Sequence, residues 1–231
     1  MTDKSGVLYF VFPDQKQIEF SSAHVRAFAK DYLDSPAHVP DNVREAVDFQ
    51  RCSVCPHVHE PGYCHALFPA LSIFEAIDKY TSSEEVEVFY LDPFSNCLIA
   101  KDTSLQDALQ CISILSLTQY CELGRRYHDY FLMVTPFMSA SEMASRIYLN
   151  AFWLFDGDKE RTKAQIKKFI EELRITIDCQ VKRMRLISKN DAFLNAFAMT
   201  HILTDLMKLD MFEVVRLNFK EHQNRTLNDQ E

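Results

Sequence analysis

The sequence contains very little glycine: four residues in a chain of 231, all far apart from one another. Phosphate-binding loops, dinucleotide-binding folds and the nucleophile elbow of serine hydrolases each need at least two closely spaced glycines. At those positions the backbone must approach a ligand or adopt a tight turn, which only glycine permits easily. The sequence therefore excludes a P-loop, a Rossmann fingerprint, a kinase glycine loop and a G-x-S-x-G hydrolase.

Long apolar runs are also missing. No stretch of about 18 apolar residues occurs, and residues 1–6 are polar, so neither a membrane span nor a secretion signal is predicted. We therefore expect a cytoplasmic protein without a membrane partner. The seven cysteines are an odd number, which is not typical of a secreted disulfide framework. In a reducing compartment, clustered cysteines are more often metal ligands or redox thiols.

Positive charge is in deficit, because 25 Lys and Arg residues face 33 Asp and Glu residues and the formal net charge is −8. Nucleic-acid binding depends on clustered cations, so no nucleic-acid partner is expected. Residues 159–189 are the exception, since Lys and Arg outnumber acids there. Such a segment is usually a solvated helix face, although it would also attract an acidic partner or a second subunit. We expect a homo-oligomer or a protein partner that binds through the helical part.

Two β-hairpin patterns occur in the first hundred residues. Each consists of two apolar or alternating runs separated by a turn that contains Pro and Asp. The runs are residues 7–12 with 17–21, and residues 85–91 with 97–101. Because an isolated hairpin is only marginally stable, we expect the two hairpins to form one antiparallel sheet of about four strands. Residues 34–42, which contain two prolines, are interpreted as a loop.

Helical patterns dominate after residue 102. Apolar residues recur at helical spacing behind two pairs of N-cap candidates, Thr103 or Ser104 and Ser139 or Ser141, and Gly157 marks a helix end. These patterns predict five or six helices and at least three times more helix than strand. The expected fold is α+β, with a small antiparallel sheet of two hairpins packed on a predominantly helical C-terminal bundle. The predicted parts are residues 1–101, residues 102–220 and a flexible tail of residues 221–231, with the first two forming one cooperative unit.

The segment from Cys52 to His65 is the main candidate for chemistry. It holds three cysteines and three histidines, namely Cys52, Cys55, Cys64, His57, His59 and His65. A C-x2-C pair brings two thiolates to one cation from a single turn. A third cysteine and one of the histidines would complete a tetrahedral zinc site. Prolines and a glycine prevent a regular helix or strand here, and a bound metal would offset the entropy cost of ordering the segment.

Two other interpretations of these cysteines remain open. They can be packed as small apolar residues beside solvated histidines, because free cysteine is often buried. They can also form a redox pair, although the lowered thiol pKa values of such pairs occur at a helix start, and here the helix is predicted to begin only after Cys64. Of the other cysteines, Cys97, Cys111 and Cys121 lie near apolar residues and are predicted to be core, whereas Cys179 is predicted to be partly exposed.

The order of elements resembles a family of uncharacterised bacterial proteins. The residues that carry the resemblance are a C-x2-C-P motif at Cys52, a cysteine ahead of a helix at Cys64, the strand Glu85-Val-Glu-Val88 and the segment Thr103-Ser-Leu-Gln-Asp-Ala-Leu109. The resemblance covers most of the chain. It supports the architecture and the selection of Cys52, Cys55 and Cys64, and it implies no substrate.

Two classes of function fit these observations. The first is a non-enzymatic interaction or regulatory protein in which a Cys/His metal knuckle has a structural role. The second is a metalloenzyme or a thiol-redox protein that uses the Cys52–His65 segment, with Glu60 as a base beside a metal that keeps an open coordination position. The absence of common catalytic motifs favours the first class.

Overall fold

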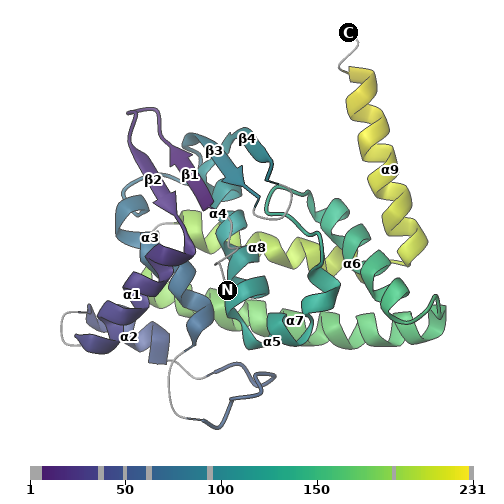
Figure 1. Ribbon diagram of the computed structural model, residues 1–231, viewed down its shortest axis with the longest axis horizontal. Coiled ribbons are helices and arrows are strands. Elements are labelled where there is room, and N and C mark those ends of the chain that lie inside the picture. The colour runs from purple at the N-terminus through teal and green to yellow at the C-terminus, as the bar shows by residue number, and fades with distance from the viewer. Residues whose placement is uncertain are drawn as a thin grey trace.

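The computed structural model describes residues 7–35, 39–48, 51–60, 64–92, 96–188 and 191–228 (Figure 1). The strands are β1 (Val7–Val11), β2 (Gln17–Phe20), β3 (Glu85–Leu91) and β4 (Leu98–Ser104). The helices are α1 (Ser22–Asp34), α2 (Asp41–Asp48), α3 (Phe68–Ile77), α4 (Leu105–Leu115), α5 (Glu122–Arg126), α6 (Ala140–Leu154), α7 (Lys159–Ile187), α8 (Asp191–Leu206) and α9 (Met211–Asn228). Three short turns complete the set: the 3-10 turns η2 (His65–Leu67) and η4 (His128–Phe131), and the π-helical turn η3 (Ser116–Tyr120).

The sheet is antiparallel throughout, with the order β2-β1-β3-β4. The first strand of each hairpin pairs with the first strand of the other, so that Tyr9 lies between Glu19 and Phe89. Alternate residues such as Leu8, Phe10 and Val88 are fully buried on the face that packs on the helices. The predicted α+β fold with one four-stranded sheet is therefore confirmed.

The N-terminal part contains more helix than its sequence pattern predicts. Helix α1 begins after Ser21, whose side chain accepts a hydrogen bond from the backbone N–H of His24. Helix α2 begins directly after Pro40, where a proline is tolerated at a helix start, so it overlaps the stretch 34–42 interpreted as loop only at its last two residues. With these helices and the short α5, the described residues form nine α-helices, and the expectation of five or six was too low.

The predicted helix ends of the C-terminal part are largely confirmed. Ser104 caps α4, and Ser139 forms a capping box with Glu142 at the start of α6. Gly157 has a positive φ of 80° after α6, a backbone conformation that favours glycine. Helix α9 continues as far as Asn228, into the stretch predicted to be a flexible tail.

The core consists of two apolar clusters that meet along α7. One joins the sheet to α1–α4 and to the start of α8, and the other joins η3, α5, α6 and most of α7 to the end of α8 and α9. Val181 of α7 packs against both clusters. Phe193 and Phe197 from α8 are part of the core under the sheet, so the C-terminal helices contribute to the core of the N-terminal part. The division of the chain at residue 101 stays a prediction.

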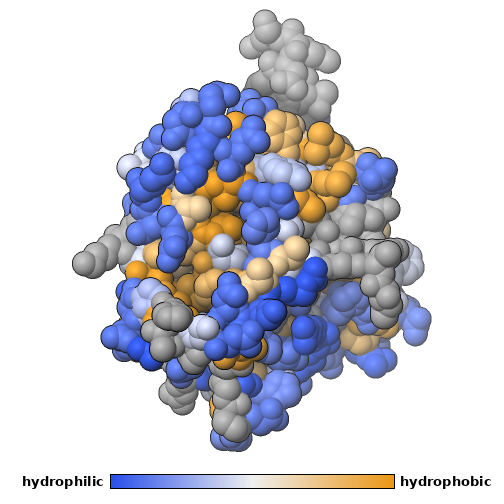
Figure 2. All heavy atoms as spheres, turned by 60° about the vertical axis from the view of Figure 1, so that its left-hand side comes forward, coloured by the Kyte–Doolittle hydropathy of each residue, from blue (hydrophilic) through white to orange (hydrophobic). Residues whose placement is uncertain are grey.

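The surface on the side of the sheet is mixed. Figure 2 shows apolar atoms in hollows of this face, between clusters of hydrophilic side chains. Several large apolar side chains are exposed on the molecule as a whole, among them Tyr9, Leu98 and Trp153.

None of the helices in the described part of the chain is long and apolar enough to cross a membrane.

Candidate functional site

A pocket of about 220 Å³ lies between the 51–60 segment and the helical part. Its walls come from three regions: the segment itself with Cys64 and His65, the junction of η3 and α5, and the middle of α7. The lining residues are Arg51, Cys52, Cys55, His57, Glu60, Cys64, His65, Tyr120, Cys121, Glu122, Leu123 and Thr176. The volume is below the range of about 300–1,000 Å³ that is usual for cofactor or drug-sized ligands. The pocket therefore suits a ligand smaller than a cofactor.

Five of the seven cysteines gather at this pocket. Cys52, Cys55 and Cys64 line it, as their spacing in the sequence suggested, and Cys121 lines it from the start of α5. Cys179 lies one helical turn after Thr176 on α7 and contacts Cys52. The thiols are close enough for their charges to affect one another. Two cysteines from distant parts of the chain thus join the three that the sequence grouped.

The closest contact in the cluster joins Cys52 to Cys179. The Cys52 thiol donates a hydrogen bond to the sulfur of Cys179, which also accepts one from the guanidinium of Arg183. These two donors, with the positive charges of Arg183 and Lys182, lower the pKa of Cys179, whereas donation to Cys179 raises the pKa of Cys52. Of the two sulfurs, Cys179 is therefore the one that ionises more readily.

The arginine beside Cys179 is completely buried, with a relative exposure of 0%. A cation away from water is costly unless it has an anionic or strongly accepting partner. The Cys179 thiolate is such a partner, because it accepts a hydrogen bond from the Arg183 guanidinium and also carries a negative charge. Burial of Arg183 and ionisation of Cys179 therefore support each other.

Burial favours the protonated form of two further thiols of the pocket, Cys64 and Cys121. Burial raises the pKa of the Cys64 thiol, and it raises the pKa of Cys121 to about 11. Cys121 was predicted to be core and is buried, yet it also faces the pocket. Cys179 was predicted to be partly exposed and is instead buried, because α7 turns this position towards the 51–60 segment.

The three candidate histidines take different positions. Both ring nitrogens of His57 face carboxylates: Nδ1 lies 2.7 Å from Oε2 of Glu60, and Nε2 lies 3.8 Å from Oε2 of Glu122. His65 lines the pocket and packs against Phe68, and its pKa is lowered by burial and by the charge of Arg125. His59 is exposed and does not line the pocket.

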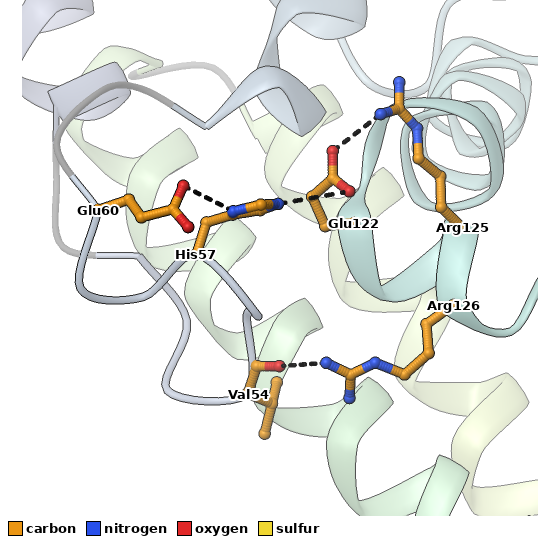
Figure 3. A network of polar contacts seen from close by, with 6 residues as sticks. All are labelled: Val54, His57, Glu60, Glu122, Arg125 and Arg126. Atoms are coloured by element: carbon orange, nitrogen blue, oxygen red, sulfur yellow. Dashed lines mark hydrogen bonds and ion pairs between the residues drawn. The ribbon is translucent and has the colours of Figure 1, made fainter.

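Polar contacts hold the 51–60 segment against α5 (Figure 3). His57 bridges Glu60 of its own segment and Glu122 of α5, and the Arg126 guanidinium donates to the backbone oxygen of Val54 over 3.5 Å. Arg126 also pairs with Glu172 of α7 at 3.1 Å. Since three backbone turns inside the segment add local order, this irregular stretch is held by contacts that need no metal.

The wall formed by Tyr120 and Cys121 depends on an unusual backbone. Helix α4 continues into the π-helical turn η3, a rare element that is frequently found at functional sites. The turn ends at Cys121, and α5 folds back so closely that a Cβ atom on Gly124 would lie 1.6 Å from the backbone oxygen of Leu117. Only glycine fits at this position, and the tight return places Cys121 opposite the 51–60 segment.

The described residues contain no group of three or more His, Cys, Asp or Glu side chains arranged to hold a metal ion. The predicted ligands Cys52, Cys55 and Cys64 do share one pocket, but His57 contacts two carboxylates and His59 does not line the pocket. Residues 61–63, between Glu60 and Cys64, lie outside the described part. Zinc binding by this segment stays a prediction.

Sequence reasoning missed Cys121, Cys179 and Arg183 as members of the site. The contact between Cys179 and Cys52 could not be predicted from the sequence, because the spacing of apolar residues in α7 does not indicate which distant segment packs against this helix. One signal was available: Cys179 and Arg183 are four positions apart on a predicted helix, which places a cation beside a thiol on the same helix face.

The chain belongs to the family described as "Domain of unknown function (DUF6901)", whose model matches residues 7–222. The match includes both hairpins, the cysteine segment and the helices up to α9, which agrees with the resemblance to an uncharacterised family. No curated protein and no solved structure matches the chain.

Proposed function

We propose that this protein is a regulatory protein whose switch is a reversible disulfide between Cys52 and Cys179. The single observation that supports the proposal most strongly is the direct hydrogen bond between these two sulfurs, with the buried Arg183 against one of them. Two sulfurs in contact are candidates for a disulfide, which forms when they approach to a bond length of about 2.05 Å.

A hydroperoxide is the class of oxidant that fits the site, because the pocket beside Cys52 has room only for a small reagent. The Cys179 thiolate attacks the terminal oxygen, the O–O bond breaks, and the leaving alkoxide takes up a proton to become an alcohol. Cys179 is then a sulfenic acid. The Cys52 sulfur attacks it and loses its proton, the S–O bond breaks, and hydroxide leaves with that proton as water. Two thiols are oxidised and one hydroperoxide is reduced.

The disulfide would change the state of the 51–60 segment. In the reduced form this segment is held by polar contacts to α5, several of which are exposed and therefore weak. A covalent link to α7 would fix the segment on the helical part and narrow the pocket. An interaction partner could then distinguish the oxidised from the reduced surface.

We expect hydrogen peroxide to convert the purified, reduced protein into a form lighter by two hydrogen atoms per chain. Peptide mapping by mass spectrometry should find the bond between Cys52 and Cys179, and dithiothreitol should reverse it. Cys179→Ser should abolish the disulfide. Cys97→Ser is the matched control, because Cys97 is exposed on the hairpin and does not line the pocket. A peroxide-treated protein with free Cys52 and Cys179 would refute the switch.

The alternative is the structural zinc knuckle predicted from the sequence, and five thiols around one pocket favour keeping it as a second candidate. In this case Cys121, which lines the same pocket, is a further donor beside Cys52, Cys55 and Cys64. Elemental analysis of protein purified without added metal decides between the two. One zinc per chain that protects these thiols from alkylation would support the knuckle, and metal-free protein with a stable fold would exclude it.

A further inference from the structure

Helix α9 projects from the body of the molecule and packs mainly on α6 (Figure 1). The two helices run antiparallel: Ser141, near the start of α6, donates to Glu221, near the end of α9, over 2.6 Å. At the other end, the hydroxyl of Tyr148 donates to the backbone oxygen of Leu209, just before α9, over 3.0 Å. Only one side of α9 is therefore covered by this pairing.

Large apolar side chains occupy the uncovered side of α9. Val214 is buried against the body, whereas the next residue, Val215, is 38% exposed, and Phe219, one turn further, is 67% exposed. Consecutive helical residues differ by about 100° around the axis, so Val215 and Phe219 share a face that lies to one side of the contact with α6.

The same arrangement occurs on α6. Tyr148 is buried beside the start of α9, the next residue, Leu149, is 39% exposed, and Trp153, one turn further, is 70% exposed. In each helix the exposed pair follows the buried residue by one position, which is a rotation of about 100° around the helix axis. Because the two helices are antiparallel, this rotation places both exposed pairs on the same side of the helix pair. The result is one apolar face composed of Leu149, Trp153, Val215 and Phe219, which we call the α6–α9 face.

We propose that a second copy of this chain covers the α6–α9 face, so that α6 and α9 of two copies form a four-helix dimer interface. In a twofold symmetric homodimer, the same patch of each copy contacts the other copy. The α6–α9 face carries apolar side chains along two adjacent helices, so two such faces can pack together as a four-helix arrangement. An apolar patch that includes an exposed tryptophan is also typical of interfaces rather than of solvated helices.

The size of the face agrees with a dimer. Helix α9 has 18 residues and is about 27 Å long, and two helices side by side are about 20 Å wide. The contact would therefore cover about 500 Å² on each copy and about 1,000 Å² in total, which reaches the lower bound for a specific interface. An interface of this kind depends on apolar packing, so it should persist at high salt, unlike an association through the basic α7 face.

The test combines mass measurement with fluorescence, because Trp153 is the only tryptophan in the chain. Sedimentation equilibrium of the full chain should give a mass that rises from 26.9 kDa towards twice this value with concentration. The emission of Trp153 should shift to shorter wavelength and lose its access to a soluble quencher over the same range. A monomer at every concentration, with Trp153 open to the quencher throughout, would overturn the proposal.

Two variants locate the interface. Phe219→Glu and Leu149→Glu should each weaken the dimer by at least about tenfold, because a carboxylate would be buried without a partner. Ile175→Glu is the matched control: Ile175 is an exposed apolar residue on the solvent side of α7, and its replacement should leave the dimer intact. Circular dichroism checks that each variant is folded. If Phe219→Glu does not fold, the proposal is tested by Leu149→Glu and by the quenching of Trp153 in the wild-type protein. A dimer that survives Leu149→Glu refutes the α6–α9 face as the interface.

Discussion

Gly124→Ala is expected to lower the free energy of unfolding by about 3 kcal/mol or more, which is a large effect for the addition of one methyl group. The new Cβ atom would lie 1.6 Å from the backbone oxygen of Leu117 and 2.7 Å from its carbonyl carbon. Both are backbone atoms, so no rotation of a side chain relieves the clash. Either α5 or the π-helical turn must move. Urea denaturation followed by circular dichroism measures the loss.

The neighbouring Arg125→Ala is the control for this substitution. Arg125 pairs with Glu122 at 2.9 Å on the surface, and such exposed ion pairs contribute at most about 1 kcal/mol. If Gly124→Ala cost no more than Arg125→Ala, the close return of α5 onto η3 would be wrong. The position of Cys121 at the pocket would then lose its structural explanation.

Arg183→Ala is expected to lower the free energy of unfolding by about 3–5 kcal/mol. The side chain is large and fully buried, so its removal leaves a cavity, and it also removes the hydrogen bond and the positive charge that stabilise the Cys179 thiolate. Lys182→Ala is the control, because Lys182 is exposed and next in the sequence, and its loss should change stability by less than about 1 kcal/mol.

A double-mutant cycle separates the cavity from the electrostatic part of this effect. Arg183→Met keeps much of the buried volume and removes the charge, and Cys179→Ala removes the sulfur. If the two groups stabilise each other, the double variant should be more stable than the sum of the single losses predicts, by about 1–3 kcal/mol. Additive losses would show that Arg183 and Cys179 act independently, which would contradict their pairing.

The fold was largely accessible from the sequence because its determinants are local. The alternation of residues 85–91 and the serine caps at Ser104 and Ser139 depend on side chains within a few positions of one another, and the structure confirms them. The elements that the sequence did not predict depend on contacts that are not local. Helix α2 was missed because Pro36 and Pro40 suggested a break, and whether a helix resumes after a proline depends on what its apolar face can pack against.

The residues of the candidate site also fall into two groups, those that the sequence indicated and those that only the tertiary structure brought together. The sequence by itself grouped Cys52, Cys55 and Cys64 as candidates for one site, because they fall within one short irregular segment, and all three line the same pocket. Only the tertiary structure decided that Cys121 and Cys179 join them, that His57 turns to Glu60 and Glu122, and that Arg183 is buried against a thiolate. The physical reason is that contacts between distant segments are set by how α5 and α7 pack on the 51–60 segment, and helical periodicity specifies which face is buried but not its partner.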